Sequence, residues 1–164
     1  RSALYTGMLH GGTDMALLLL ENGADPNWAC ERNYYIPIVM AAYFAKEELV
    51  EELIRRSANV NVSNGDPGTP LHAAASAGSL ELTRRFLDLG LSPDRVNGHD
   101  QTPLAMAAHR GQIEVVKLLL DVRDHTKPLS DKVWEEANYR ASVSGDDTIV
   151  QLLQAYSQRR TAER

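Results

Sequence analysis

The stretch Thr69-Pro70-Leu71-His72 is followed by Ala74-Ala75, and the same arrangement returns 33 residues later as Thr102-Pro103-Leu104-Ala105 with Ala107-Ala108. A glycine, Gly78 or Gly111, follows each copy, and a run of hydrophobic residues comes soon after the glycine. A fixed period of this length is typical of a chain built from stacked units of one kind. The period therefore predicts an array that offers surfaces for binding rather than an active site.

The same period extends over most of the chain. Thirty-three residues before Thr69 lies Ile36-Pro37-Ile38-Val39, with Ala41-Ala42 in the positions of the paired alanines. At the N-terminal end, a first unit fits at a period of 34 if Gly11 forms the turn and one extra residue lies near Trp28. At the C-terminal end, Gly145 marks a degenerate fifth unit 34 residues after Gly111. We expect one domain over residues 1–164, with approximate units at 1–33, 34–66, 67–99, 100–132 and 133–164 and one continuous core.

The residue types in each unit predict a helix, a turn and a second helix. A threonine such as Thr69 or Thr102 caps a helix N-terminus by accepting a backbone N–H, and proline at the next position loses no hydrogen bond. The glycine that follows permits the tight turn between two antiparallel helices. Between units, Asn64-Gly65 and Asn97-Gly98 recur at the same spacing and are hairpin-turn signals, which predict a short finger projecting from each junction.

This pattern resembles the ankyrin repeat over essentially the whole chain, most specifically in the third and fourth units. The resemblance implies an all-α solenoid of stacked helix-turn-helix units with short β-hairpin fingers. It also implies that His72 is structural and bonds near the capping threonine. The chain departs from the family at Ala45 and Ser57, which replace the turn glycine and the helix-ending glycine of the second unit.

The ends of the array depart further from the pattern. Residues 121–128 replace the usual fourth finger, and Ser130 is a predicted cap for a helix reaching about Ser144, whose Trp134 we expect to cover the last core layer. The first unit places Leu17 at a slot that is polar in the other units. An array without a polar cap exposes apolar surface, so we expect the parent protein to continue upstream; the alternative is that Leu17 packs locally.

Candidate contact residues follow from the resemblance, because partners of ankyrin repeats usually dock at the slot before the Thr-Pro-Leu-His box and at the two slots before the turn glycine. Five of the ten aromatic residues lie between positions 28 and 44, and aromatic residues on an exposed face are typical of interface hot spots. The alternative is that some of them pack between fingers. The predicted partner-binding residues are Trp28, Tyr34, Tyr35, Tyr43, Phe44, Ser76, His99, Gln101, His109 and Arg110.

Composition and motifs argue against most other classes of function. A net charge of −5 and a pI of about 5.5 do not suit a nucleic-acid or anionic-membrane surface. We find no phosphate loop, zinc-finger spacing or nucleophile elbow. We interpret Asp121, Asp124 and His125 as a solvated loop, and the acidic run 47–52 as a solvated helix face, with contact to a basic partner left open. The single cysteine, Cys30, excludes an internal disulfide and suits a reducing compartment.

We therefore predict a non-catalytic protein-protein interaction module, or scaffold, that binds a protein or peptide on its concave and finger face. The alternative is a regulatory or targeting domain of a larger enzyme or channel. We expect no catalytic residue, no cofactor and no metal, and a partner that is not a nucleic acid, a membrane or a small-molecule substrate. We further expect a monomer located in the cytoplasm or nucleus.

Overall fold

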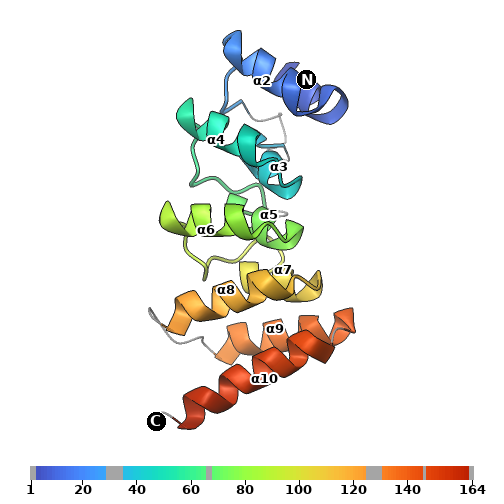
Figure 1. The fold of residues 1–164 in the computed structure, drawn as a ribbon, viewed down its shortest axis with the longest axis vertical. Coiled ribbons are helices and arrows are strands. Elements are labelled where there is room, and N and C mark those ends of the chain that lie inside the picture. Colours follow the sequence, from blue (N-terminus) through green and yellow to red (C-terminus); the bar gives the residue numbers. More distant parts are fainter. Residues whose placement is uncertain (1–2, 29–34, 66–67, 125–130, 146, 163–164) are drawn as a thin grey trace.

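The computed structural model describes residues 3–28, 35–65, 68–124, 131–145 and 147–162, and these residues form a stack of helix pairs (Figure 1). The first helices of the successive pairs are α1 (Ala3–Thr6) with the π-turn η1 (Gly7–Gly11), α3 (Pro37–Tyr43), α5 (Pro70–Ala77), α7 (Pro103–His109) and α9 (Asp131–Ser144). The second helices are α2 (Gly12–Glu21), α4 (Glu47–Arg55), α6 (Leu80–Asp88), α8 (Ile113–Asp124) and α10 (Asp147–Ala162). The expected all-α solenoid is confirmed.

The capping residues set where the first helices begin. The hydroxyl of Thr69 accepts a hydrogen bond from the backbone N–H of His72 at the start of α5, and Thr102 accepts one from Ala105 at the start of α7. Proline occupies the first turn of both helices and of α3, but α3 follows Ile36, whose side chain makes no cap. The second pair thus keeps the proline of the pattern and lacks its hydroxyl.

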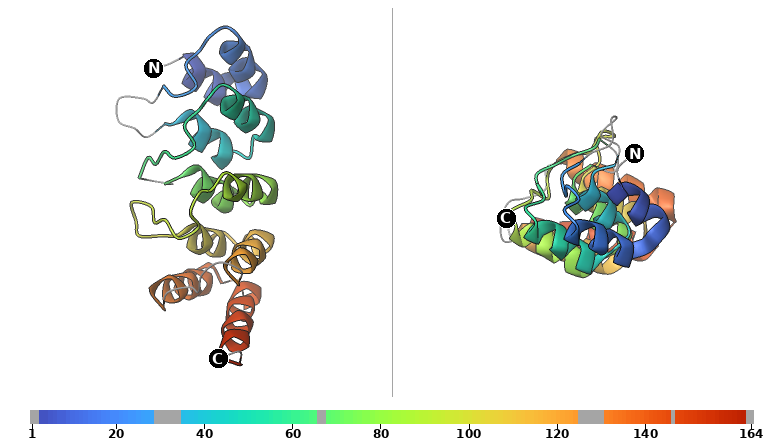
Figure 2. Two further views of the ribbon diagram at one scale, coloured as in Figure 1. Left: turned by 90° about the vertical axis from the view of Figure 1, so that its left-hand side faces the viewer. Right: turned by 90° about the horizontal axis from the view of Figure 1, so that it is seen from above.

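Paired alanines allow the first helices to approach one another closely. Both members of each pair are fully buried in α3, α5 and α7, and each first helix packs against the next one, from α3 through α5 and α7 to α9. Figure 2 shows the helices stacked along one axis with the connecting segments projecting to one side. A continuous row of first helices is therefore available behind those segments.

The buried apolar side chains form two clusters rather than the single core we expected. One extends from Leu4 to Leu91, and the other from Ala75 to Tyr156. Polar His72 and Ser76 are also buried on α5, the helix that packs against α7 of the fourth pair. Leu87 packs against both clusters and joins them.

The turn positions confirm two predicted departures and correct one assignment. Ala45 and Ser57 adopt left-handed backbone conformations, with φ of 50° and 63°, in the places where glycine is usual. In the first pair the left-handed residue is Gly12, with φ of 72°, so the turn is not at Gly11. Gly12 and Ala45 are 33 residues apart, but Gly23 and Ser57, which follow the second helices with φ of 85° and 63°, are 34 apart. The extra residue expected near Trp28 is therefore present, and the first pair is one residue shorter between Gly12 and Gly23 than the second pair is between Ala45 and Ser57.

The segments between pairs are closed by turns, and the described residues contain no β-strand in them. In the second finger (56–69) the N–H of Asn64 donates to the carbonyl of Gly68 at 3.2 Å, and in the third finger (89–102) that of Asn97 donates to Gln101 at 2.9 Å. The N–H of Gly98 donates to the carbonyl of Gly65, which joins the two fingers. The predicted hairpin turns are thus present without the ladder of a strand pair.

The two ends of the stack differ as follows. Trp134 of α9 stacks on Tyr156 of α10, with ring centroids 6.3 Å apart, and packs against the last core cluster as predicted. The segment expected to replace the fourth finger begins as helix, because α8 continues to Asp124 in the absence of an ending glycine. At the other end Leu17 is half-buried and packs against the first cluster, which supports the alternative of local packing. The exposed apolar side chains of that pair are Leu9, Met15 and Leu18.

Candidate functional site

The exposed aromatic side chains of the second pair lie at the two ends of α3. Tyr35 precedes the helix and is 40% exposed, whereas Tyr43 and Phe44 follow one another at its C-terminal end and are 39% and 47% exposed. Side chains that are fully buried could not anchor a partner, and none of these three is. The exposure that the docking hypothesis requires is therefore present at all three positions.

The ring contacts divide these aromatics into two pairs. Tyr35 packs on Tyr5 of α1 with ring centroids 4.5 Å apart, and Tyr43 meets Phe44 edge to face at 5.5 Å. A helix rises about 1.5 Å per residue, so the length of α3 separates the two pairs by roughly 10 Å. They form two contact points along one helix rather than a single cluster, and Tyr35 is partly used in packing between the first and second pairs.

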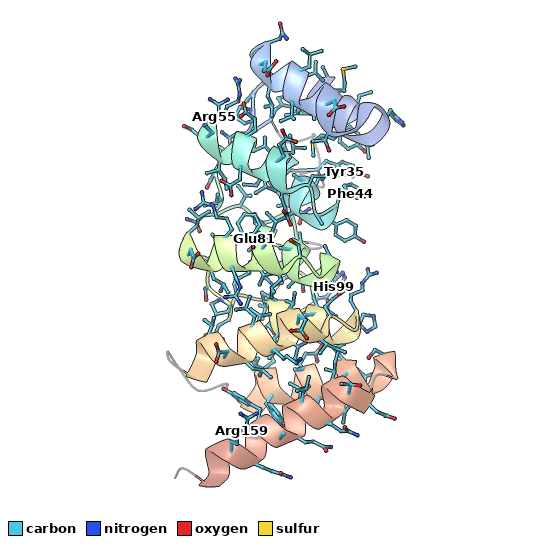
Figure 3. The ribbon with its side chains drawn as sticks, viewed as in Figure 1. Tyr35, Phe44, Arg55, Glu81, His99 and Arg159 are labelled. Atoms are coloured by element: carbon cyan, nitrogen blue, oxygen red, sulfur yellow. The ribbon has the colours of Figure 1, made fainter. Side chains whose placement is uncertain are left out.

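The other predicted contact residues occupy different environments. His99, His109 and Arg110 are exposed, Trp28 and Gln101 are half-buried, and Ser76 is buried; Tyr34 lies outside the described residues. In Figure 3 the labelled Tyr35, Phe44 and His99 lie toward the same edge of the stack, away from Arg55.

Two of the predicted residues have structural contacts. The backbone carbonyl of Gln101 accepts a hydrogen bond from Nε2 of His72 at 3.0 Å, and the carbonyl of Ser76 accepts one from the Gln112 side chain at 3.5 Å. Both residues link the third pair to the fourth. The Ser76 side chain adds no exposed surface to the row of first helices.

His72 is held as a neutral, buried imidazole. Its Nδ1 lies 2.8 Å from the hydroxyl of Thr69 and accepts the Thr69 N–H at 3.2 Å, while Nε2 donates to Gln101. Burial disfavours the charged ring and lowers the pKa of His72 to about 4, although the bond to the Gln101 carbonyl opposes this shift. All its polar atoms are used within the fold, which agrees with the structural role implied by the sequence.

Charge differs between the two sides of the stack. On the outer helices Arg85 of α6 pairs with Glu51 of α4 through two hydrogen bonds of 2.7 and 3.0 Å, and Glu52 pairs with Arg55 and Arg56. Those bonds from Arg56 and Arg55 lower the pKa of Glu52, and the bond to Glu51 raises the pKa of Arg85. Glu51 and Glu52, two members of the acidic run considered as a contact for a basic partner, are thus already paired with arginines of this chain.

Basic side chains lie instead at the turn between the two helices in the second and fourth pairs. Lys46 follows the left-handed Ala45, and Arg110 follows His109 at the end of α7; all three side chains are exposed. No ion pair joins Lys46 or Arg110 to a carboxylate in the part of the chain that the structure describes.

Outside the second pair, one further aromatic side chain is strongly exposed. Tyr139 of α9 is 60% exposed and the guanidinium of Arg140 lies 5.7 Å from its ring centroid, while Val143 one turn later is 54% exposed. Residues four apart share a helix face, so Tyr139 and Val143 are exposed on one side of α9.

The described residues contain no group of three His, Cys, Asp or Glu side chains able to hold a metal ion. Among the same residues, no helix is both long enough and apolar enough to cross a bilayer.

Comparison with known proteins identifies the family. The sequence model described as "Ankyrin repeats (3 copies)" matches residues 38–131, more than half of the chain. The chain is 32% identical to the ARF GTPase-activating protein Git of Drosophila melanogaster, over 52% of this chain and 12% of that protein. It is 33% identical to the human transient receptor potential cation channel subfamily A member 1, over 48% of this chain and 8% of that protein. It is also 35% identical to the human 2-5A-dependent ribonuclease over 42% of this chain and 9% of that protein. The chain spans less than a fifth of the length of these relatives, and it belongs to the ankyrin repeat family.

Proposed function

We propose that this chain is a non-catalytic binding module that recognises a protein or peptide along its first helices and fingers. Ankyrin repeats are in general protein-protein interaction modules. The observation that carries the proposal is the exposure of Tyr35, Tyr43 and Phe44 at the two ends of α3, whose residues from Pro37 to Ala42 are buried. Aromatic side chains supply a large contact area at low cost in conformational entropy, and they are enriched among residues that dominate binding energy.

The proposed contact surface runs from α3 towards α7. Tyr43 and Phe44 form its apolar end, and Arg110, next to His109, forms a basic end at the equivalent turn of the fourth pair. Between them, Ser76 and Ala77 present little side-chain surface, which leaves room for a polypeptide backbone. The surface suits an extended or helical segment with an apolar anchor, bound by shape and charge without chemistry.

The test is to select peptides from a random library displayed on phage against the native chain and to titrate them against variants. Tyr43→Ala is expected to weaken binding by about tenfold or more, as hot-spot truncations do. Tyr139→Ala is the matched control, because Tyr139 is an exposed tyrosine at the other end of the stack. Equal loss with both variants, or no loss with Tyr43→Ala at matched folded fraction, would contradict the proposal.

A second candidate function is that of a regulatory or targeting domain within a larger protein. It is favoured by the relatives, which include a GTPase-activating protein, a cation channel and a ribonuclease, each far longer than the matched segment. The test is to introduce Tyr43→Ala and Tyr35→Ala into the complete gene product and to measure its activity and cellular location. A change in either quantity, with the isolated chain still folded, supports this role.

A further inference from the structure

A hollow of about 250 Å³ opens between the first and second helix pairs, at the edge of the stack where the helix-helix turns lie. Its apolar lining comes from both pairs: Met8 and Leu9 belong to η1, and Ala41, Phe44 and Leu49 belong to α3, α4 and the turn between them. An apolar cavity of ~150 Å³ is large enough to hold benzene. The hollow therefore has room for the side chain of a leucine, isoleucine or methionine.

The lining combines a fixed floor with accessible walls. Ala41 and Leu49 are buried, whereas Leu9 and Phe44 are exposed. Tyr43 packs edge to face on Phe44 and restrains that wall. An apolar side chain entering the hollow would cover the Leu9 and Phe44 surface that is now in contact with water, which favours its binding.

One positive charge lies at the rim of this hollow. Lys46 lines it, is exposed, and makes no ion pair within the described part of the chain. The two glutamates that follow Lys46 are directed elsewhere. Glu47 accepts a hydrogen bond from the Ser79 hydroxyl of the third pair at 3.4 Å, and Glu48 lines a different groove on the outer helices. Charge complementarity therefore calls for a carboxylate next to the apolar group.

We propose that the hollow accepts an aliphatic side chain of a partner polypeptide whose neighbouring acidic residue pairs with Lys46. An extended chain advances about 3.4 Å per residue, so a carboxylate one or two positions from the aliphatic residue is within reach of the flexible lysine. This inference rests on the proposed function and specifies the chemistry of the partner. It assigns the first two helix pairs as the part of the array that selects the partner.

The test uses the random peptide library, selected separately on the native chain and on Lys46→Glu. Peptides selected on the native chain are expected to carry an aliphatic residue within two positions of an aspartate or glutamate, and to lose about tenfold or more in affinity for Lys46→Glu. Like-charge contacts oppose binding, so selection on Lys46→Glu is expected to enrich lysine or arginine at the acidic position. Lys132→Glu, which reverses an exposed charge on α9, is the control and is expected to change neither result.

The outcomes separate the two proposals. Selected peptides whose affinity depends on Tyr43 but not on Lys46 would overturn the inference and leave the proposed function intact. Enrichment of aliphatic residues without a neighbouring acid would also overturn it. If the native chain enriches no peptide, both proposals fail.

Discussion

The imidazole of His72 joins α5 to the third finger, because its Nε2 donates a 3.0 Å hydrogen bond to the backbone carbonyl of Gln101. The other ring nitrogen accepts from Thr69, so both nitrogens are occupied in the neutral form. Protonation would place a second donor opposite the Thr69 N–H and would bury a charge. One side chain thus couples the stability of the junction between the third and fourth pairs to pH.

The first prediction concerns this coupling. The pKa of His72 lies near 4 in the folded chain against 6.5 ordinarily, so between these values the unfolded chain binds a proton that the folded chain does not. Stability is therefore unaffected by this group above pH 6.5 and falls as the pH drops from 6.5 to 4, by about 1.4 kcal/mol per pH unit and ~3 kcal/mol in all. Urea unfolding at a series of pH values measures the slope.

The control for this prediction is a comparison of two variants. His72→Gln is expected to be less stable at pH 7.5 and to show a flatter profile between pH 6.5 and 4.5, since it removes the titrating ring. His109→Gln changes an exposed histidine and is expected to keep the native slope. A native slope in His72→Gln would assign the pH dependence to other groups.

The second prediction is that glycine stabilises the second pair at its two left-handed positions. Ala45 and Ser57 have φ of 50° and 63°, a conformation that costs a residue with a Cβ atom about 1–2 kcal/mol. Glycine avoids this cost but loses more chain entropy on folding, so Ala45→Gly and Ser57→Gly should each add ~0.5 kcal/mol. Thermal unfolding of Ala155→Gly, an exposed mid-helix position in α10, should show the opposite sign, a loss of about 1 kcal/mol.

Most of the fold was predictable because the repeated residues act locally. Thr69 and Pro70 set a helix start whatever lies around them, and the paired alanines permit close packing wherever the unit occurs. The first turn was assigned wrongly because Gly11 and Gly12 are adjacent, and only the packed structure shows which is left-handed. The π-turn before it has no signal in the residue types.

The candidate site was predicted residue by residue but not in its geometry. The contact slots selected exposed positions such as Tyr43 and Phe44, at the C-terminal end of a first helix. They also selected Ser76, whose side chain is buried. The alignment of the repeats gives the position of each contact residue within its unit but not the distance between residues. Tyr35 and Tyr43 were therefore grouped together, although α3 separates them. The hollow beside Lys46 needs two pairs in contact and has no local signature.

The third prediction compares two capping threonines. Thr69 caps α5 and its hydroxyl also contacts Nδ1 of His72, whereas Thr102 only accepts from the N–H of Ala105. Loss of a cap costs about 1 kcal/mol, and a lost bond to a second buried group adds about another. Thr69→Ala is therefore expected to lower the free energy of unfolding by ~2 kcal/mol and Thr102→Ala by ~1 kcal/mol. Equal losses in urea titrations at pH 7.5 would show that the His72 contact adds nothing.

The last prediction separates backbone strain from steric conflict at two glycines. Gly90 and Gly68 both have positive φ, 83° and 110°, but a Cβ atom at Gly90 would meet nothing within 4 Å, whereas one at Gly68 would lie 2.7 Å from Cβ of Asn97 and 3.1 Å from the His72 ring. Asn97 cannot move aside freely, because its Oδ1 accepts two backbone hydrogen bonds in the third finger. Gly90→Ala should cost about 1 kcal/mol from strain alone. Gly68→Ala should cost about 3 kcal/mol or more, since overpacking adds to the strain. If both variants unfold at the same urea concentration, the contact between the second and third fingers yields readily and contributes little to the rigidity of the proposed contact surface.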